Sequence, residues 1–158
     1  ASADIAANLR ANILYKTYST TDFKTDTDVS YDRMLTYRSD LRAALAPLLQ
    51  NTGAELELYG KYIETADTKY LGQLSSAAAN YRAAAEGAAA LTIPRDAVNY
   101  HKDILNAMEK FSATLDQMAT HAADPLASAA LLRTFNQAET DMYTSFNALS
   151  NYYGQKTP

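Results

Sequence analysis

The chain has 158 residues and a formal net charge of −4, a size typical of a single domain with one hydrophobic core. Ala and Leu together number 48 whereas Ile and Val number 7, and this bias favours helices over strands. The composition excludes a β protein, a low-complexity chain and a nucleic-acid binder that depends on bulk positive charge. Because the chain has no Cys, disulfides, thiolate metal ligands and Cys nucleophiles are excluded as well.

The first third of the chain predicts two helices separated by a polar loop. Apolar residues recur with helical spacing over residues 4–18, where we expect the first helix. Residues 19–28 are rich in Thr and Asp and are predicted to form a loop. A second helix is predicted over residues 30–50, and Pro47 should bend its last turn because proline has no backbone N–H to donate.

A long third helical region is predicted over residues 54–91. Two steps of four residues around Tyr70 interrupt its apolar seam, which predicts local unwinding or a break. The seam comprises Leu56, Tyr59, Ile63, Ala66, Tyr70, Leu74, Ala77, Tyr81, Ala84, Ala88 and Leu91.

Proline residues mark the predicted starts of the last two helices. Pro94 is expected to open the fourth helix, and Asp124 followed by Pro125 predicts an N-cap and the first residue of the fifth. Gly154 should end the fifth helix. The fourth seam comprises Ala97, His101, Ile104, Met108, Phe111, Leu115, Met118 and Ala122, and the fifth comprises Leu132, Phe135, Met142, Phe146, Leu149 and Tyr153.

The connections after Gln50, Leu91 and Ala122 are short, so neighbouring helices should pack antiparallel. The predicted fold is therefore all-α, an up-and-down antiparallel helical bundle with four main helices plus a shorter N-terminal helix. We expect one domain over 1–158, made of an N-terminal helix (1–20), an acidic loop (21–29) and a main bundle (30–153).

Sequence motifs of known enzymes are missing. Di-metal bundles carry Glu-x-x-His, but Val98 and Met118 stand three residues before His101 and His121. The His-Glu-x-x-His, Walker and dinucleotide-binding motifs are also missing. The sequence therefore predicts a protein that is not an enzyme and that carries no cofactor.

His101 lies on the apolar seam of the fourth helix and has two interpretations. It is either a ligand or pH-sensitive group, or a structural His bonded to a neighbouring helix. His121 lies about 200° further around a 3.6-residue helix, so the two cannot share a ligand through one face. We favour a buried, neutral, structural His101, and we expect Asn106, about 140° around the helix, to face a different neighbour or solvent.

An aspartate cluster precedes and begins the second helix, and carboxylates on a flexible loop can bind Ca²⁺. The EF-hand pattern is missing, because Tyr31 and Tyr37 stand where that loop has Gly and Glu. We favour a solvated loop whose charges support the helix N-terminus. The candidate metal ligands are Asp22, Asp26, Asp28 and Asp32.

Tyr is unusually common, with 12 Tyr against 4 Phe and no Trp. Tyr59, Tyr70 and Tyr81 lie on a predicted seam, where their rings would pack and their hydroxyls stay wet. A binding face made by the other tyrosines is the alternative.

The chain resembles a family of uncharacterised helical proteins of Candidate Phyla Radiation (parcubacterial-type) bacteria. The similarity is clearest from Ile93 onward and weaker over residues 9–18. Members of that family look like extracytoplasmic domains behind one N-terminal membrane segment, so the resemblance implies that such a segment was removed here. It implies no activity and no functional residue. The similar positions are Pro94, His101, Leu105, Asn106, Met118, Asp124 and Pro125, with Phe135 where an aromatic residue is usual.

Our leading hypothesis is a non-enzymatic extracytoplasmic module with a structural or protein-interaction role at the cell envelope. It rests on the missing catalytic motifs, a start without Met, the low Lys and Glu usage and the resemblance. The alternatives are a small-ligand or metal-binding bundle, based on His101 and the Asp-rich loop, and a self-assembling surface subunit. We expect a protein partner or self-association, no nucleic acid, and a membrane only through a removed N-terminal anchor.

Overall fold

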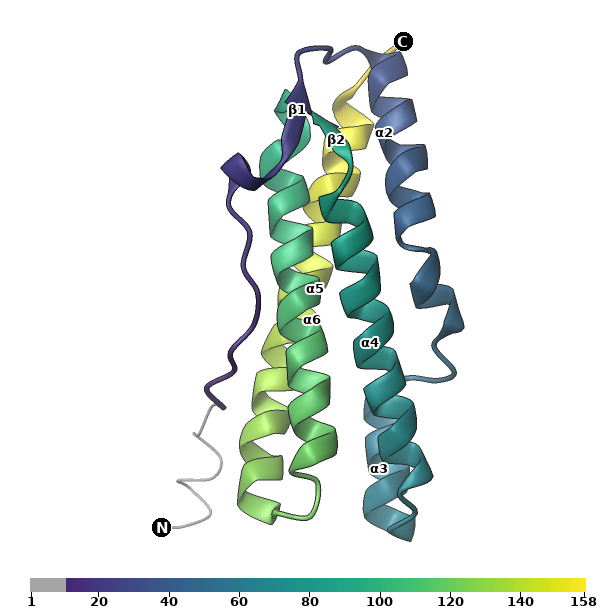
Figure 1. The fold of residues 1–158 in the computed structure, drawn as a ribbon, viewed down its shortest axis with the longest axis vertical. Coiled ribbons are helices and arrows are strands. Elements are labelled where there is room, and N and C mark those ends of the chain that lie inside the picture. Colours follow the sequence, from purple (N-terminus) through teal and green to yellow (C-terminus); the bar gives the residue numbers. More distant parts are fainter. Residues whose placement is uncertain (1–10) are drawn as a thin grey trace.

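The computed structural model describes residues 11–158, and this part of the chain is mostly helical and bundle-like (Figure 1). The α-helices are α2 (Tyr31–Ala44), α3 (Glu55–Thr65), α4 (Lys69–Ala89), α5 (Val98–Thr120) and α6 (Pro125–Gln155). They are joined by 3₁₀ helices at Thr20–Asp22, Ala46–Gln50 and Arg95–Ala97, and by the strands β1 (Lys24–Asp26) and β2 (Thr92–Pro94). The prediction of a mostly helical protein is confirmed.

The predicted N-terminal helix is wrong over the residues that the structure describes. Residues 11–19 form neither helix nor strand and run beside α5 (Figure 1), while residues 4–10 lie outside the described part. The Tyr18 backbone N–H donates to Asn106 Oδ1 at 2.6 Å, and Asn106 Nδ2 donates to the Tyr18 carbonyl at 3.0 Å. The backbone N–H and C=O of Tyr18, which a helix would pair internally, are thus paired with the Asn106 side chain of α5. Asn106 therefore faces the segment of residues 11–19, which is a different neighbour from the groups that hydrogen-bond to His101.

The predicted acidic loop (21–29) contains a strand that the sequence analysis missed. β1 pairs with β2 in parallel, with Lys24 opposite Thr92 and Asp26 opposite Pro94. Arg33 of α2 bonds to both strands, since its Nε donates to Asp26 Oδ2 at 2.8 Å and its Nη2 donates to the Thr92 carbonyl at 2.8 Å. Pro94 therefore ends β2 and does not open α5, which begins at Val98.

The predicted third helix is broken into α3 and α4, as its stutter indicated. Ala66 ends α3 in the left-handed conformation (φ 55°), which stops the helical hydrogen-bond ladder. The predicted seam fails ahead of this break, because Leu56 and Ile63 are 47% and 60% exposed. Tyr59 is buried as predicted, but Leu58, which lies off the predicted seam, is buried as well, so the register predicted for α3 was wrong at Leu56 and Ile63.

The other predicted helix boundaries have clear local causes. Ser30 caps α2 by accepting from the Arg33 N–H, and Pro47 lies in the 3₁₀ helix that replaces the last turn of the predicted helix. Asp124 caps α6 by accepting from the N–H groups of Leu126 and Ala127, with Pro125 as the first helical residue. The predicted cap at Asp124 and Pro125 is confirmed.

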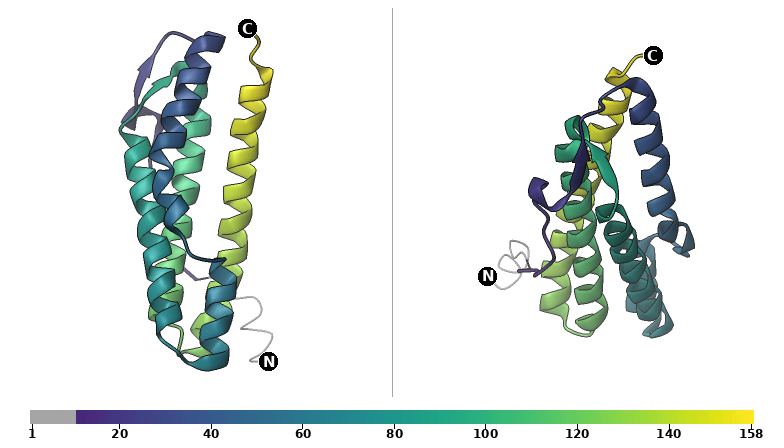
Figure 2. Two further views of the ribbon diagram at one scale, coloured as in Figure 1. Left: turned by 90° about the vertical axis from the view of Figure 1, so that its right-hand side faces the viewer. Right: turned by 45° about the horizontal axis from the view of Figure 1, so that its top comes forward.

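Helix α5 lies between α4 and α6 and carries the core (Figures 1 and 2). All of its predicted seam residues are buried, from Ala97 to Ala122. One cluster of buried residues surrounds Phe111 and Phe135, whose ring centres lie 5.3 Å apart. A second cluster surrounds Tyr37 and His101 near the β1–β2 pair. The core is therefore continuous along α5, and α2 joins it only toward one end.

Candidate functional site

His101, the predicted candidate ligand, is fully buried near the start of α5. Its Nε2 lies 2.9 Å from the Ala88 carbonyl oxygen, and its Nδ1 lies 2.7 Å from the Tyr37 hydroxyl oxygen. Because a carbonyl oxygen only accepts, Nε2 carries the proton and Nδ1 accepts from the Tyr37 hydroxyl. The ring therefore connects α5 with α4 and α2, which is the structural role predicted for it.

The environment of His101 favours the neutral imidazole. Burial lowers the pKa of His101 to about 4, and the hydrogen bond to Ala88 opposes this only in part. Phe23 covers the ring edge-on, with ring centres 5.1 Å apart. A metal ion at either ring nitrogen would have to break one of the two hydrogen bonds, so this geometry suits packing better than ligation.

The structure does not gather the candidate metal ligands Asp22, Asp26, Asp28 and Asp32. Asp26 pairs with Arg33, and Asp28 accepts from the Ser30 N–H at 2.9 Å as a capping contact. Within residues 11–158, no group of three or more His, Asp or Glu side chains is placed to hold a metal ion. The solvated and capping role is the one that the geometry supports.

Many of the tyrosines form packed clusters. Tyr152 and Tyr153 lie 5.8 Å apart between ring centres, and Tyr153 lies 6.3 Å from Tyr37 on α2. Tyr100 stacks against Tyr152 at 5.4 Å, and the Tyr152 hydroxyl donates to Asp96. Packing therefore explains this cluster without a tyrosine binding face.

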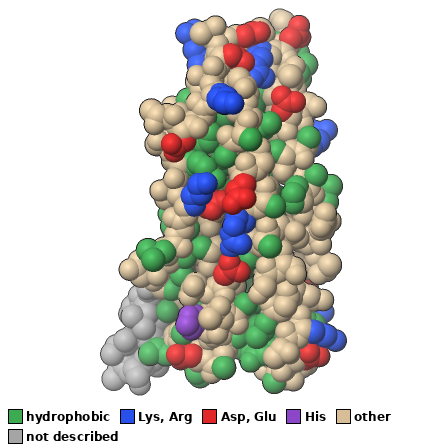
Figure 3. All heavy atoms as spheres, viewed as in Figure 1, with side chains coloured by type: hydrophobic (Ala, Val, Ile, Leu, Met, Phe, Trp, Pro, Cys, Tyr) green, Lys and Arg blue, Asp and Glu red, His purple; other side chains and the backbone are tan. Residues whose placement is uncertain are grey.

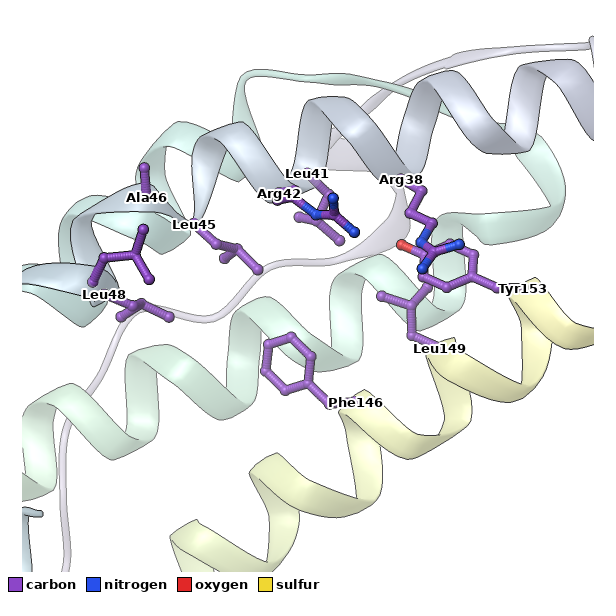
Figure 4. A pocket seen from close by; sticks show the side chains of 10 residues that line it. Arg38, Leu41, Arg42, Leu45, Ala46, Leu48, Phe146, Leu149 and Tyr153 are labelled. Atoms are coloured by element: carbon purple, nitrogen blue, oxygen red, sulfur yellow. The ribbon is translucent and has the colours of Figure 1, made fainter.

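A groove separates α2 and the following 3₁₀ helix Ala46–Gln50 from the C-terminal half of α6 (Figure 4). Its cavity volume is about 380 Å³, within the range of about 300–1,000 Å³ that small-molecule sites occupy. The left view of Figure 2 shows α2 and α6, the two helices that contribute side chains to its wall. The groove wall is almost entirely apolar, with the side chains Leu41, Leu45, Leu48, Leu49, Phe146 and Leu149.

Local backbone chemistry leaves this groove open. Helix α2 ends at Ala44, and the 3₁₀ helix containing Pro47 continues the chain in a tighter geometry. Leu49 is consequently 89% exposed, and Phe146 on the opposite wall is only half-buried. Leucines that an uninterrupted helix would press against α6 instead line a space open to solvent.

Two arginines and a tyrosine lie at one end of the groove. Figure 4 shows Arg38 beside the Tyr153 ring, whereas Leu45 and Leu48 lie toward the other end. The Arg38 guanidinium carbon lies 5.6 Å from the Tyr153 ring centre, a cation–π contact. Burial raises the pKa of Tyr153 to about 12, although both Arg38 and Arg42 lower it. The groove is thus apolar along its length and positive at one end.

Sequence reasoning missed this groove although it found most of its wall. Leu41, Leu45 and Leu48 recur at helical spacing within the predicted second helix, and Phe146 and Leu149 lie on the predicted seam of the fifth helix. We expected neighbouring helices to cover the apolar faces of both helices, so the sequence predicted no groove between them. Arg38 and Arg42, four residues apart on a predicted helix, were the available signal for its charged end.

A buried carboxyl on α5 was also missed. Glu109 is buried, and its Oε1 has no hydrogen-bond partner among the described residues. Burial raises the pKa of the Glu109 carboxyl, and the neighbouring Glu86 charge raises it further.

On the face shown in Figure 3, acidic and basic side chains alternate and do not separate by sign. This face therefore offers no extended basic surface for nucleic acid.

Over residues 11–158, no helix combines the length and the apolarity that crossing a bilayer requires. The resemblance to Candidate Phyla Radiation proteins stays a prediction. Comparisons with protein families, with curated proteins and with solved structures find no match to this chain.

Proposed function

We propose that this protein is a non-enzymatic binding module whose groove between α2 and α6 receives a small apolar ligand. The observation that carries the proposal is the groove itself, an apolar cavity of about 380 Å³ between two helices. Water in contact with leucine and phenylalanine side chains is unfavourable, and a ligand that replaces it gains the free energy of apolar burial. Large apolar surfaces that a fold leaves open commonly mark interaction sites.

The chemistry of the groove supports binding without catalysis. Among the side chains that line it, none is a carboxylate, an imidazole or a serine hydroxyl. Tyr153 contributes the one hydroxyl, and its raised pKa keeps it protonated near neutral pH. A general base or nucleophile for the usual hydrolytic mechanisms is therefore missing from this wall. The lining therefore supports a non-enzymatic role for the groove, and its open apolar wall supports ligand binding.

The finer architecture and the location are also proposals. Short connections, residues 90–97 between α4 and α5 and residues 121–124 between α5 and α6, support an up-and-down antiparallel bundle. The resemblance of the chain from Ile93 onward supports a place outside the cytoplasm, at the cell envelope. Fractionation of native cells would test that location.

Self-association is the second candidate function, because several large apolar side chains are exposed together with the groove. Leu49 is 89% exposed, and Ile63 and Leu56 of α3 are each about half exposed or more. Pairing of two copies would cover such side chains. Light scattering at high protein concentration tests this candidate, and a monomer at every concentration would remove it.

The binding proposal is tested with a neutral apolar dye, N-phenyl-1-naphthylamine, titrated into the full chain. Its fluorescence should rise on binding. Ala46→Phe, which adds a ring at a residue of the groove lining, should weaken dye binding by about tenfold or more. Ala123→Phe is the matched control, because Ala123 is exposed in the turn between α5 and α6, outside the groove. No fluorescence change, or equal binding by both variants, would contradict the proposal.

A further inference from the structure

The two ends of the groove differ in polarity. Figure 4 places Arg38 and Tyr153 at one end, and Leu45, Ala46 and Leu48 toward the other. A ligand that matched only the apolar wall would leave the charged end unused. A ligand that carried a charge without an apolar chain would leave the leucines in contact with water.

Arg38 and Arg42 give the groove its positive charge. Within the described residues, neither Arg38 nor Arg42 forms an ion pair with a carboxylate. The two lie four residues apart on α2, where like charges repel each other. The Arg38 guanidinium carbon lies 5.6 Å from the centre of the Tyr153 ring, so the two side chains contact each other at this end of the groove. Guanidinium groups bind carboxylate and phosphate oxygens through paired hydrogen bonds.

The layout of the groove suits a single extended alkyl chain. Its lining side chains follow one another along α2 and the 3₁₀ helix Ala46–Gln50, from Arg38 to Leu45 and Leu48. A chain whose head group lies at the arginines would extend along the leucines.

We infer that the groove binds a free single-chain amphiphile with an anionic head group, a long-chain carboxylate in the simplest case. The head group would lie at Arg38 and Arg42, and the alkyl chain would pass between Leu45 and Phe146. This inference rests on the proposed function and specifies its ligand class. The Tyr153 hydroxyl lies at the same end and would donate to the head group.

The test is displacement of N-phenyl-1-naphthylamine from the full chain by three ligands of equal chain length. Dodecanoate should bind about tenfold more tightly than 1-dodecanol, and dodecyltrimethylammonium should bind most weakly. Going from octanoate to dodecanoate should tighten binding about fourfold per methylene, which is the value of one buried methylene. Combining Arg38→Gln with Arg42→Gln should abolish the preference for dodecanoate over dodecanol, which is measured as the ratio of the two affinities within each variant. Arg133→Gln is the matched control, since Arg133 lies on α6 outside the groove lining.

The outcomes separate the inference from the function beneath it. Equal binding of dodecanoate and dodecanol, or no effect of the double arginine variant, overturns the inference while the apolar binding site stands. If no dye binds to the parent chain, the proposed function fails and the inference fails with it. If the protein sediments with phosphatidylglycerol vesicles but ignores monomeric dodecanoate, the arginines recognise a membrane surface, and the inference of a free ligand is overturned.

Discussion

The two halves of α6 carry similar apolar patterns but meet different neighbours. In the N-terminal half, Phe135 is 1% exposed and packs against Phe111 of α5. In the C-terminal half, Phe146 and Tyr153 are only half-buried and line the groove that faces α2. One helix thus belongs to a closed core at one end and to an open site at the other.

The difference lies in the neighbouring helix and not in α6 itself. Helix α5 continues for 23 residues and offers buried side chains over its whole length. Helix α2 stops at Ala44, and the 3₁₀ helix with Pro47 turns its leucines away from full contact. An apolar pattern therefore predicts that a face will avoid water, but the length and continuity of the opposing helix decide whether protein covers it or a groove stays open.

The largest expected contrast is between two phenylalanines on these two sides. Phe111→Ala should lower the free energy of unfolding by about 3–5 kcal/mol, because Phe111 is 1% exposed and its removal leaves a cavity. Phe146→Ala should cost roughly 1 kcal/mol, since Phe146 already borders an open groove and little cavity forms. Urea denaturation of both variants measures the difference. Equal costs would show that the groove is closed in solution.

The next effect concerns the hydrogen bonds that join α2 to the closed core at His101. The pKa of His101 is about 4 in the folded chain and near 6.5 in the unfolded chain. At a pH between these two values, His101 therefore takes up a proton when the chain unfolds. The contribution of the neutral His101 to the free energy of unfolding is fully present above pH 6.5 and is lost as the pH falls toward 4. The total loss over this range is roughly 3 kcal/mol.

His101→Gln is the matched variant for this pH dependence, because the amide keeps hydrogen-bonding groups but does not titrate. The difference in unfolding free energy between parent and variant, measured from pH 4.5 to 8, should shrink toward acid pH. Carboxylates titrate in both proteins and cancel in this difference. A difference that stays constant over the whole range would show that His101 is not held neutral.

The parts predicted correctly from the sequence are those that depend on local chemistry or on a fully surrounded helix. Asp124 and Pro125 identify the start of α6 because capping involves only adjacent residues. The seam of α5 is correct because protein surrounds that helix along its length, so every seam position is buried. The inward, hydrogen-bonded His101 follows from the same seam.

The parts that sequence reasoning missed depend on relations between distant segments. The seam drawn through Leu56 and Ile63 assumed one continuous helix, but the break at Ala66 uncouples the register of α3 from that of α4. The pairing of Lys24 with Thr92 joins three-residue strands far apart in the chain, and such short segments carry no detectable period. The groove depends on the spacing of α2 and α6, which neither helix encodes alone.

The smallest expected effect tests the outer edge of the groove. Leu49→Ser should change the free energy of unfolding by less than about 0.5 kcal/mol, because Leu49 is 89% exposed and loses almost no burial. Leu149→Ala is the control on the opposite wall, and this buried residue should cost about 2–5 kcal/mol. Thermal and urea unfolding of both variants provide the measurement. A cost above about 1 kcal/mol for Leu49→Ser would mean that Leu49 packs against another surface in solution, either α6 or a second copy. Sedimentation of the parent chain at the same concentration separates these two, because packing onto α6 leaves a monomer and pairing between copies does not.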